Sequence, residues 1–335
     1  MMNSVILAVE TSCDETACAI VKNGNEILSN VVSSQISVHK KFGGVVPEVA
    51  SRLHVENISL VIEEAIKVAN ISWEHIDAVA VTQGPGLIGS LHVGVQAAKT
   101  LAWMHQKPFI PIHHLVGHIY ANSFVDELQF PLLALVVSGG HTELVFMKDE
   151  WSFEIIGETQ DDAIGEAYDK VARVLGLSYP GGPEIDKLSK VGSVTYVLPK
   201  PKTEKAMDFS FSGLKSAVLQ LIQREEKQGN KIRKADLAAT FQETAMDLII
   251  DKTMLAVDTM KPVQLVLAGG VAANSALRQK MIQVMELRKG IHLTIPPLWC
   301  CTDNAAMIAS AGAKAFEKNK TGDFKCSAMP SMEMM

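Results

Sequence analysis

The same strand-turn-strand pattern occurs twice in this sequence, and this repeat restricts the possible folds more than any other feature. Apolar runs at residues 5–9 and 17–21 flank one polar turn, and largely apolar runs at residues 132–137 and 143–147 flank another. A pattern that recurs far along one chain indicates a duplicated structural unit. We therefore expect two related lobes, each built around one hairpin.

Helical and strand-like segments alternate after each hairpin. Apolar residues recur at helical spacing in residues 52–69 and 162–175, and short apolar runs at residues 78–81 and 265–268 are typical of buried strands. This alternation predicts an α/β fold with mixed sheets, helices on their faces and a cleft between two lobes. The last residues, 329–335, lack such a pattern and predict a ragged tail.

Composition excludes several classes of protein. With 47% hydrophobic and 20% charged residues in 335, the chain can bury one large core or two of ordinary domain size, and we favour two. Its apolar runs fall short of the roughly 20 residues that span a bilayer, and no secretory signal opens it, so we expect a cytoplasmic protein without membrane contact. Five cysteines without Cys-x-x-Cys spacing predict reduced thiols. A net charge of −6 means that any nucleic-acid site is local or shared.

A histidine pair is the strongest chemical signal. His114 and His118 stand four residues apart, so on a helix both imidazoles project from one face toward one metal ion. The pair needs a third ligand, and spacing alone leaves open Asp303, a neighbouring cysteine or a more distant carboxylate. Two nitrogens and one carboxylate oxygen would suit iron(II) or zinc and leave positions open for substrate.

Three glycine-rich segments are candidates for binding an anion, at residues 84–90, 138–141 and 269–274. Glycine lets backbone N–H groups approach an anion closely, and the last segment follows a predicted strand and opens a predicted helix, the geometry that holds a nucleotide at a helix N-terminus. None fits the G-x-G-x-x-G or P-loop template, so each alone is equally compatible with a structural turn.

Acidic side chains complete the candidates. Asp14 and Glu15 lie at the tip of the first hairpin, where they either act chemically or only favour the turn. Glu166, Asp169 and Asp186 lie around a predicted helix and the loop after it, where they either accept hydrogen bonds from a ribose or base or form a solvated helix face.

Six segments together resemble one family. They are ETSCDET at residues 10–16, FGGVVPE at 42–48, GPG at 84–86, HHLVGH at 113–118, VSGGHT at 137–142 and TDN at 302–304. In these segments the chain resembles the bacterial tRNA adenosine threonylcarbamoyltransferase family, and the similarity runs from the first strand to about residue 315. The resemblance implies two ribonuclease-H-like lobes of the actin/sugar-kinase/heat-shock-chaperone superfamily, with a nucleotide and metal cleft at the centre.

The resemblance also implies lobe boundaries and a reaction. The N-terminal lobe would comprise residues 1–130, with a helix at about 304–320 packing back on it, and the C-terminal lobe residues 131–303. The reaction would move a threonylcarbamoyl group from L-threonylcarbamoyladenylate to N6 of adenosine 37 in tRNAs that read ANN codons, releasing AMP.

Matching the motifs position by position assigns roles to residues. One divalent metal per subunit, Fe²⁺ or Zn²⁺, would be held by His114, His118 and Asp303, and Asp14 with Glu15 would be the catalytic acidic pair. The adenylate donor would be contacted by Val136, Val137, Ser138, Gly139, Gly140, Asp169, Gly182, Asp186 and Asn274. The implied partners are tRNA, a smaller paralogous subunit of the same fold, an accessory ATPase subunit and a synthase that supplies the threonylcarbamoyl-adenylate.

Three other functions fit parts of the pattern. A metalloprotease would also use two histidines four residues apart, but it needs a glutamate after the first histidine, where this chain has Leu115. A small-molecule kinase of the same superfamily would bind ATP and magnesium, and the histidine pair counts against it. A non-catalytic ATP-binding scaffold subunit would have no need of the metal and donor segments.

Overall fold

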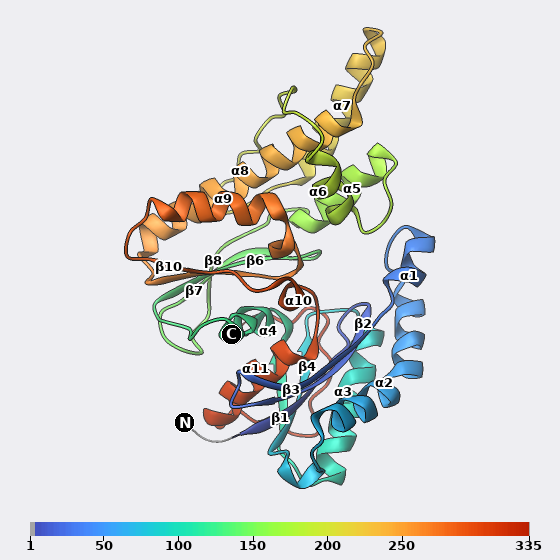
Figure 1. Ribbon diagram of the computed structural model, residues 1–335, viewed down its shortest axis with the longest axis vertical. Helices are drawn as coiled ribbons and strands as arrows, with labels where there is room; N and C mark the ends of the chain where they lie inside the picture. Colours follow the sequence, from blue (N-terminus) through green and yellow to red (C-terminus); the bar gives the residue numbers. More distant parts are fainter. Residues whose placement is uncertain (1–3, 335) are drawn as a thin grey trace. The chain divides into compact units, whose positions relative to one another are not determined.

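The computed structural model describes residues 4–334, which form two compact units (Figure 1). Unit 1 combines residues up to 128 with residues 296–334, and unit 2 comprises residues 129–295. Each unit is built on a five-stranded mixed sheet. No helix within the described residues combines the length and apolarity that a membrane crossing needs.

The sheet of unit 1 has the order β3-β2-β1-β4-β5. Its strands are β1 (Val5–Glu10), β2 (Glu15–Lys22), β3 (Glu26–Ser34), β4 (Ala78–Gly84) and β5 (Phe109–His113). The first three strands pair antiparallel, whereas β1, β4 and β5 run parallel. Strand β1 is therefore central, which explains why it is apolar on both faces.

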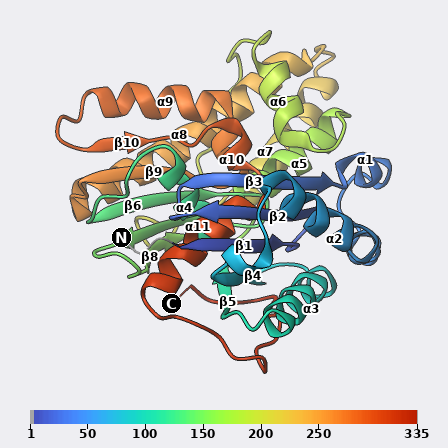
Figure 2. The same cartoon turned by 60° about the horizontal axis from the view of Figure 1, so that its bottom comes forward.

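Helices cover both faces of this sheet, as Figures 1 and 2 show. Leu7 and Val9 belong to a core cluster with buried residues of α2 (Pro47–Ala69) and α3 (Ile88–Met104). Ile6, which alternates with them along the strand, lies on the other face beside Gly312 of α11 (Ala305–Glu317). Because Gly312 has no side chain, α11 can lie close against the sheet.

The sheet of unit 2 repeats this plan with the order β8-β7-β6-β9-β10. Its strands are β6 (Leu132–Val137), β7 (Thr142–Met147), β8 (Glu154–Glu158), β9 (Gln264–Ala268) and β10 (His292–Thr294). An antiparallel hairpin is again extended by a third antiparallel strand, and parallel strands again continue on the other side of the first strand. The duplication predicted from the two hairpins is confirmed.

Short helices and the helices of unit 2 complete the structure. They are α1 (Ile36–His39), α4 (His114–Tyr120), α5 (Ile164–Leu175), α6 (Gly181–Ser189), α7 (Ser212–Lys227), α8 (Lys234–Met260), α9 (Ser275–Glu286) and α10 (Leu298–Cys301), with 3₁₀ turns at Lys40–Phe42, Trp73–His75, Ala121–Phe124 and Gly270–Ala273. Helices α9 and α11 begin with asparagine caps, because the side chains of Asn274 and Asn304 accept hydrogen bonds from backbone N–H groups in their first turns.

The C-terminal segment is anchored, so the expectation of a ragged tail is wrong for residues 329–334; residue 335 lies outside the described residues. The N–H of Met329 donates to the carbonyl of Gln83 at 2.9 Å, and the N–H of Gly86 donates to the carbonyl of Pro330 at 3.2 Å. The carbonyl of Met332 lies 3.1 Å from Nε2 of His113. These hydrogen bonds, two of them between backbone groups and one between the His113 side chain and the backbone, are not encoded in hydrophobic patterning.

Gly84 packs directly against the anchored C-terminal segment. A Cβ atom added there would overlap the backbone carbonyl of Met329. We expect Gly84→Ala to lower the free energy of unfolding by about 1–3 kcal/mol, because the neighbouring backbone must shift. Urea unfolding and limited proteolysis of the tail measure this effect. Gly44→Ala is the control, since a Cβ there meets nothing within 4 Å, and equal stability of the two variants would contradict the packing.

Candidate functional site

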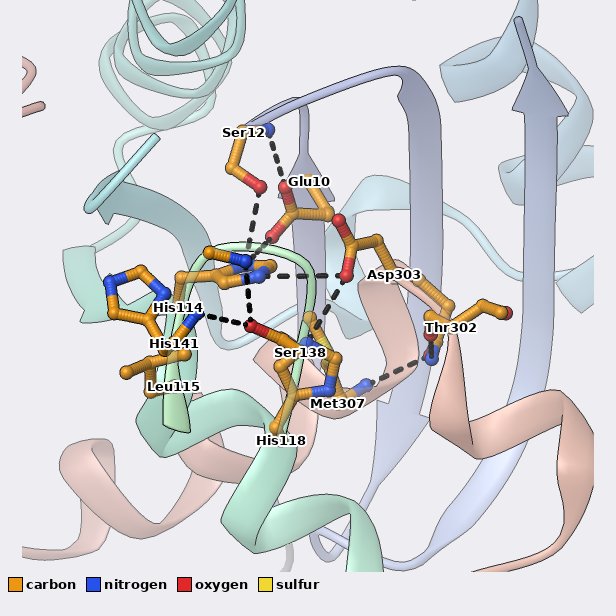
Figure 3. Close-up of polar contacts among 12 residues, drawn as sticks. Glu10, Ser12, His114, Leu115, His118, Ser138, His141, Thr302, Asp303 and Met307 are labelled. Atoms are coloured by element: carbon orange, nitrogen blue, oxygen red, sulfur yellow. Dashed lines mark hydrogen bonds and ion pairs between the residues drawn. The ribbon is translucent and has the colours of Figure 1, made fainter. Parts of the chain in front are cut away.

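Three side chains of unit 1 converge as the histidine spacing predicts (Figure 3). Helix α4 begins at His114, directly after β5, and His118 lies one turn further on. Asp303 precedes α11. Its Oδ1 lies 3.1 Å from Nε2 of His118 and 3.5 Å from Nε2 of His114, and the three potential ligand atoms lie within 4.8 Å of one another. Among the third ligands that spacing left open, Asp303 is the one that the geometry brings next to both histidines.

This donor set fits a divalent transition metal. His114 and His118 are buried, while the Asp303 side chain is 23% exposed. Two imidazole nitrogens and one carboxylate oxygen suit zinc or iron(II) and leave coordination positions for other ligands. The residue after His114 is Leu115, a core side chain, so the glutamate base of an HExxH protease is absent from this helix.

Charge in the cluster also favours a cation. Burial lowers the pKa of His114, but the carboxylates of Asp303 and Glu10 outweigh burial and raise it to about 9. Burial raises the pKa of Asp303, whereas the His114 and His118 charges lower it to about 2. The carboxylates of Glu10 and Asp303 therefore both face the protonated imidazole of His114, and a metal ion would take the place of its proton.

The predicted acidic pair lies in the same unit, and its loop is held by several contacts. Asp14 and Glu15 are both buried. Burial and the neighbouring Asp14 and Asp303 carboxylates raise the pKa of Glu15 to about 10, so this carboxyl group is neutral at physiological pH and can donate a hydrogen bond. The N–H of Gln35 donates to the Asp14 carbonyl at 3.0 Å.

His54 supports this loop from helix α2, a role that sequence reasoning missed. Its Nε2 lies 2.9 Å from the carbonyl oxygen of Cys13, and its Nδ1 lies 2.8 Å from the hydroxyl of Thr16. A nitrogen facing a carbonyl carries its hydrogen, so Nδ1 is the acceptor from Thr16 in the neutral ring. Burial lowers the pKa of His54, which is consistent with a neutral structural histidine.

The donor-binding candidates lie in unit 2, and several of them line the carboxyl ends of two neighbouring parallel strands. Val136 and Val137 are buried in β6. Ser138 follows them, and its hydroxyl accepts hydrogen bonds from the N–H groups of Gly140 at 3.3 Å and His141 at 3.0 Å. Gly139 and Gly140 have open space where a side chain would be. Ligands bind at such strand ends in α/β sheets.

Asp186 and Asn274 belong to one polar network. The Asp186 carboxylate accepts from the hydroxyl of Ser275 at 2.8 Å and from the amide of Gln242 at 3.2 Å. The amide nitrogen of Asn274 donates to Gln242 at 3.1 Å and to the Tyr168 hydroxyl at 3.4 Å. Gln242 thus links the two candidates and was missed from the sequence, where it reads as an ordinary helical residue.

Asp169 and Gly182 lie at the adjoining turn of the same unit. The Asp169 carboxylate accepts a hydrogen bond of 2.7 Å from the N–H of Gly181, which fixes the start of α6. Gly182 has no atom within 4 Å of the position a Cβ would take. The donor-binding roles of Asp169 and Gly182 stay predictions, because neither observation involves a ligand.

Solved structures of low sequence identity share the fold. Full-length HypF, in a phosphate- and nucleotide-bound form, matches with a TM-score of 0.62 and 16% identity over 94% of this chain and 46% of that chain. (R)-2-hydroxyglutaryl-CoA dehydratase component A from Acidaminococcus fermentans matches with a TM-score of 0.52 and 15% identity over 94% of this chain and 98% of that chain. The predicted fold class, an actin/sugar-kinase/heat-shock-chaperone-like α/β fold with two lobes, is confirmed.

Closer relatives have one function in common. A tRNA N6-adenosine threonylcarbamoyltransferase of Bacillus cereus is 56% identical over 333 residues, covering 99% of this chain and 97% of the relative. One of Listeria welshimeri is 56% identical over 332 residues, covering 98% and 96%. The family model described as tRNA N6-adenosine threonylcarbamoyltransferase matches residues 26–310. With this match over most of its length, the chain belongs to the tRNA N6-adenosine threonylcarbamoyltransferase family.

Proposed function

We propose that this chain transfers the threonylcarbamoyl group of L-threonylcarbamoyladenylate to N6 of adenosine 37 in tRNAs reading ANN codons and releases AMP. The convergence of His114, His118 and Asp303 inside a chain of this family is the observation that carries the proposal. The donor is a mixed anhydride and already electrophilic, so the protein has to orient the two substrates and stabilise the charge that develops on oxygen.

The metal centre is assigned to the threonylcarbamoyl part of the donor. His114, His118 and Asp303 would hold one Fe²⁺ or Zn²⁺, which when bound supplies Lewis-acid polarisation of the threonylcarbamoyl carbonyl. Within unit 2, Ser138 to Gly140 and Asn274 would hold the adenylate, with Val136, Val137, Asp169, Gly182 and Asp186 as further donor contacts. The open space at Gly139 and Gly140 supports close approach of a phosphate to this turn.

The acidic pair is assigned to proton transfer. Nucleophilic attack through the exocyclic amine requires loss of a proton, and an ionised carboxylate beside the amine can accept it. Asp14 is our candidate for this base. Glu15, whose pKa is raised to about 10, would remain protonated. Its carboxylic O–H would donate a hydrogen bond to the Asp14 carboxylate and so orient it.

Partners are part of the proposal. The chain has a net charge of −6, so its overall charge does not favour tRNA, whose binding depends on contacts between basic side chains and phosphates. We expect a smaller paralogous subunit of the same fold and an accessory ATPase subunit to assist, and a separate synthase to supply the donor.

A transfer assay tests this function. Purified chain, with its partners, is mixed with threonylcarbamoyl-adenylate and unmodified tRNA, and threonylcarbamoyladenosine is quantified by mass spectrometry of the digested tRNA. We expect one AMP released per modified adenosine. Asp14→Asn should slow a single turnover by about 10²–10⁴-fold, the usual contribution of acid-base catalysis. Glu26→Gln, at an exposed position of strand β3, should not. Absence of modified adenosine with all partners present would refute the proposal.

A further inference from the structure

We propose that Glu10 is a positioning residue of the metal centre, holding His114 with its Nδ1 hydrogen toward the Glu10 carboxylate and its Nε2 lone pair toward His118 and Asp303. This inference rests on the proposed metal site and deepens it. Glu10 is the last residue of β1, and nothing in the spacing of the histidines points to it.

The geometry around Glu10 fixes the direction of its carboxylate. Glu10 is fully buried. Its Oε1 accepts from the N–H of Ser12 at 2.5 Å, and its Oε2 accepts from the hydroxyl of Thr82 at 2.5 Å. The same Oε2 lies 3.1 Å from Nδ1 of His114 (Figure 3). The Ser12 N–H and the Thr82 hydroxyl on β4 therefore hold the carboxylate in place independently of His114.

The Glu10 carboxylate determines which nitrogen of His114 is free to bind a metal. An ionised carboxylate is only an acceptor, so Nδ1 of His114 must carry a hydrogen and the lone pair of the neutral ring falls on Nε2. Nε2 is the nitrogen that lies 3.5 Å from Asp303. A carboxylate behind a histidine ligand fixes the ring orientation and makes the ligand more basic. The Ser12 hydroxyl, 3.2 Å from Nδ1, can donate or accept and so makes no such choice.

His118 has no equivalent support. Its Nδ1 is buried and has no hydrogen-bond partner within the described residues. Within the described residues, a carboxylate therefore fixes the position of the ring hydrogen in His114 but not in His118. Glu10 is not a further ligand in this arrangement, because it faces the opposite edge of the His114 ring from the three converging ligand atoms.

The variant Glu10→Gln tests the role of the carboxylate at nearly constant volume. The N–H of Ser12 requires the amide oxygen, so the amide NH₂ would face Nδ1 of His114. This donor would favour Nδ1 as an acceptor and place the hydrogen on Nε2, where it competes with the metal. We expect the affinity for Zn²⁺, measured by competition with a chromophoric chelator, to fall about 10–100-fold with unchanged stoichiometry.

Two controls separate positioning from loss of packing. Asp208→Asn removes another buried carboxylate, which accepts from Gln160 at 2.9 Å in unit 2, and should keep wild-type affinity. Thr82→Val removes one of the two hydrogen bonds that hold the carboxylate but leaves the carboxylate itself as the acceptor facing His114, so it should lower affinity by less than Glu10→Gln does. A loss after Thr82→Val as large as that after Glu10→Gln would overturn the proposal, because the effect would then come from the tie between β1 and β4.

A spectroscopic measurement tests the proposal on unmodified protein, whether or not Glu10→Gln folds. In the zinc-loaded protein, ¹⁵N NMR of labelled histidines should show His114 with metal on Nε2 and hydrogen on Nδ1. Metal on Nδ1, or wild-type affinity in folded Glu10→Gln, would overturn the role of Glu10 while leaving the metal site intact. Failure of the metal site itself looks different: wild-type protein and His114→Ala would then bind zinc equally poorly.

Discussion

His118→Ala should remove metal binding and reduce threonylcarbamoyl transfer to background while the protein stays folded. His118 is 1% exposed, and its Nε2, one of the three potential ligand atoms that converge within the described residues, lies 3.1 Å from Asp303. Loss of a direct ligand should cost more than the roughly 10–100-fold in affinity that follows loss of an outer partner. Metal content by plasma mass spectrometry, tRNA modification and circular dichroism together measure the effect.

The matched control for this variant is His92→Ala, since His92 is exposed on α3. It should bind metal and transfer the group as the wild type does. Wild-type transfer by metal-free His118→Ala would contradict the assignment, because the proposed Lewis-acid contribution would then be unnecessary.

Glu143→Gln should stabilise the protein at pH 8 by about 2–3 kcal/mol and leave its stability near pH 4 almost unchanged. Burial, and then the Glu158 carboxylate on the neighbouring strand, raise the pKa of Glu143 from 4.5 to about 7, and Glu143 is paired directly opposite Glu158 in the β7–β8 register. Between about pH 4.5 and pH 7, Glu143 therefore retains in the folded protein a proton that it has lost in the unfolded chain. Its unfolding free energy therefore falls as the pH rises, by about 1.4 kcal/mol per unit of pKa shift.

Urea unfolding at several pH values from 4 to 8 measures this effect. Glu154→Gln is the control, because Glu154 is an exposed carboxylate on the same strand as Glu158, and it should follow the wild-type curve. If Glu143→Gln showed the same dependence on pH as the wild type, Glu143 would be ionised in the folded protein despite its burial.

Features encoded by local patterning were predictable from the sequence. The two hairpins follow from apolar runs around polar turns, and the His114 and His118 pair follows from the helical repeat, because both signals lie within a few residues. Asp303 lies 185 residues from His118, so spacing could not select it over a cysteine, and only the family resemblance did.

Contacts formed by the tertiary fold were not predictable in this way. Glu10 meets His114 across 104 residues, and it reads in the sequence as the end of a strand. Residues 329–334 have no periodic pattern, yet backbone hydrogen bonds to Gln83 and Gly86 hold them. Such interactions depend on which segments the fold brings together, and local periodicity and spacing do not reveal this.

The discontinuity of unit 1 has a consequence for how the protein is synthesised. Strand β1 emerges from the ribosome early, but α11, which covers one of its faces, follows only after all of unit 2. At about 5–20 residues per second, translating residues 129–295 takes on the order of ten seconds or more. During that interval α11 is not yet available to cover the face of the sheet that includes Ile6, and His114 and His118 are without Asp303. Metal loading should therefore be among the last steps of maturation, after translation is essentially complete.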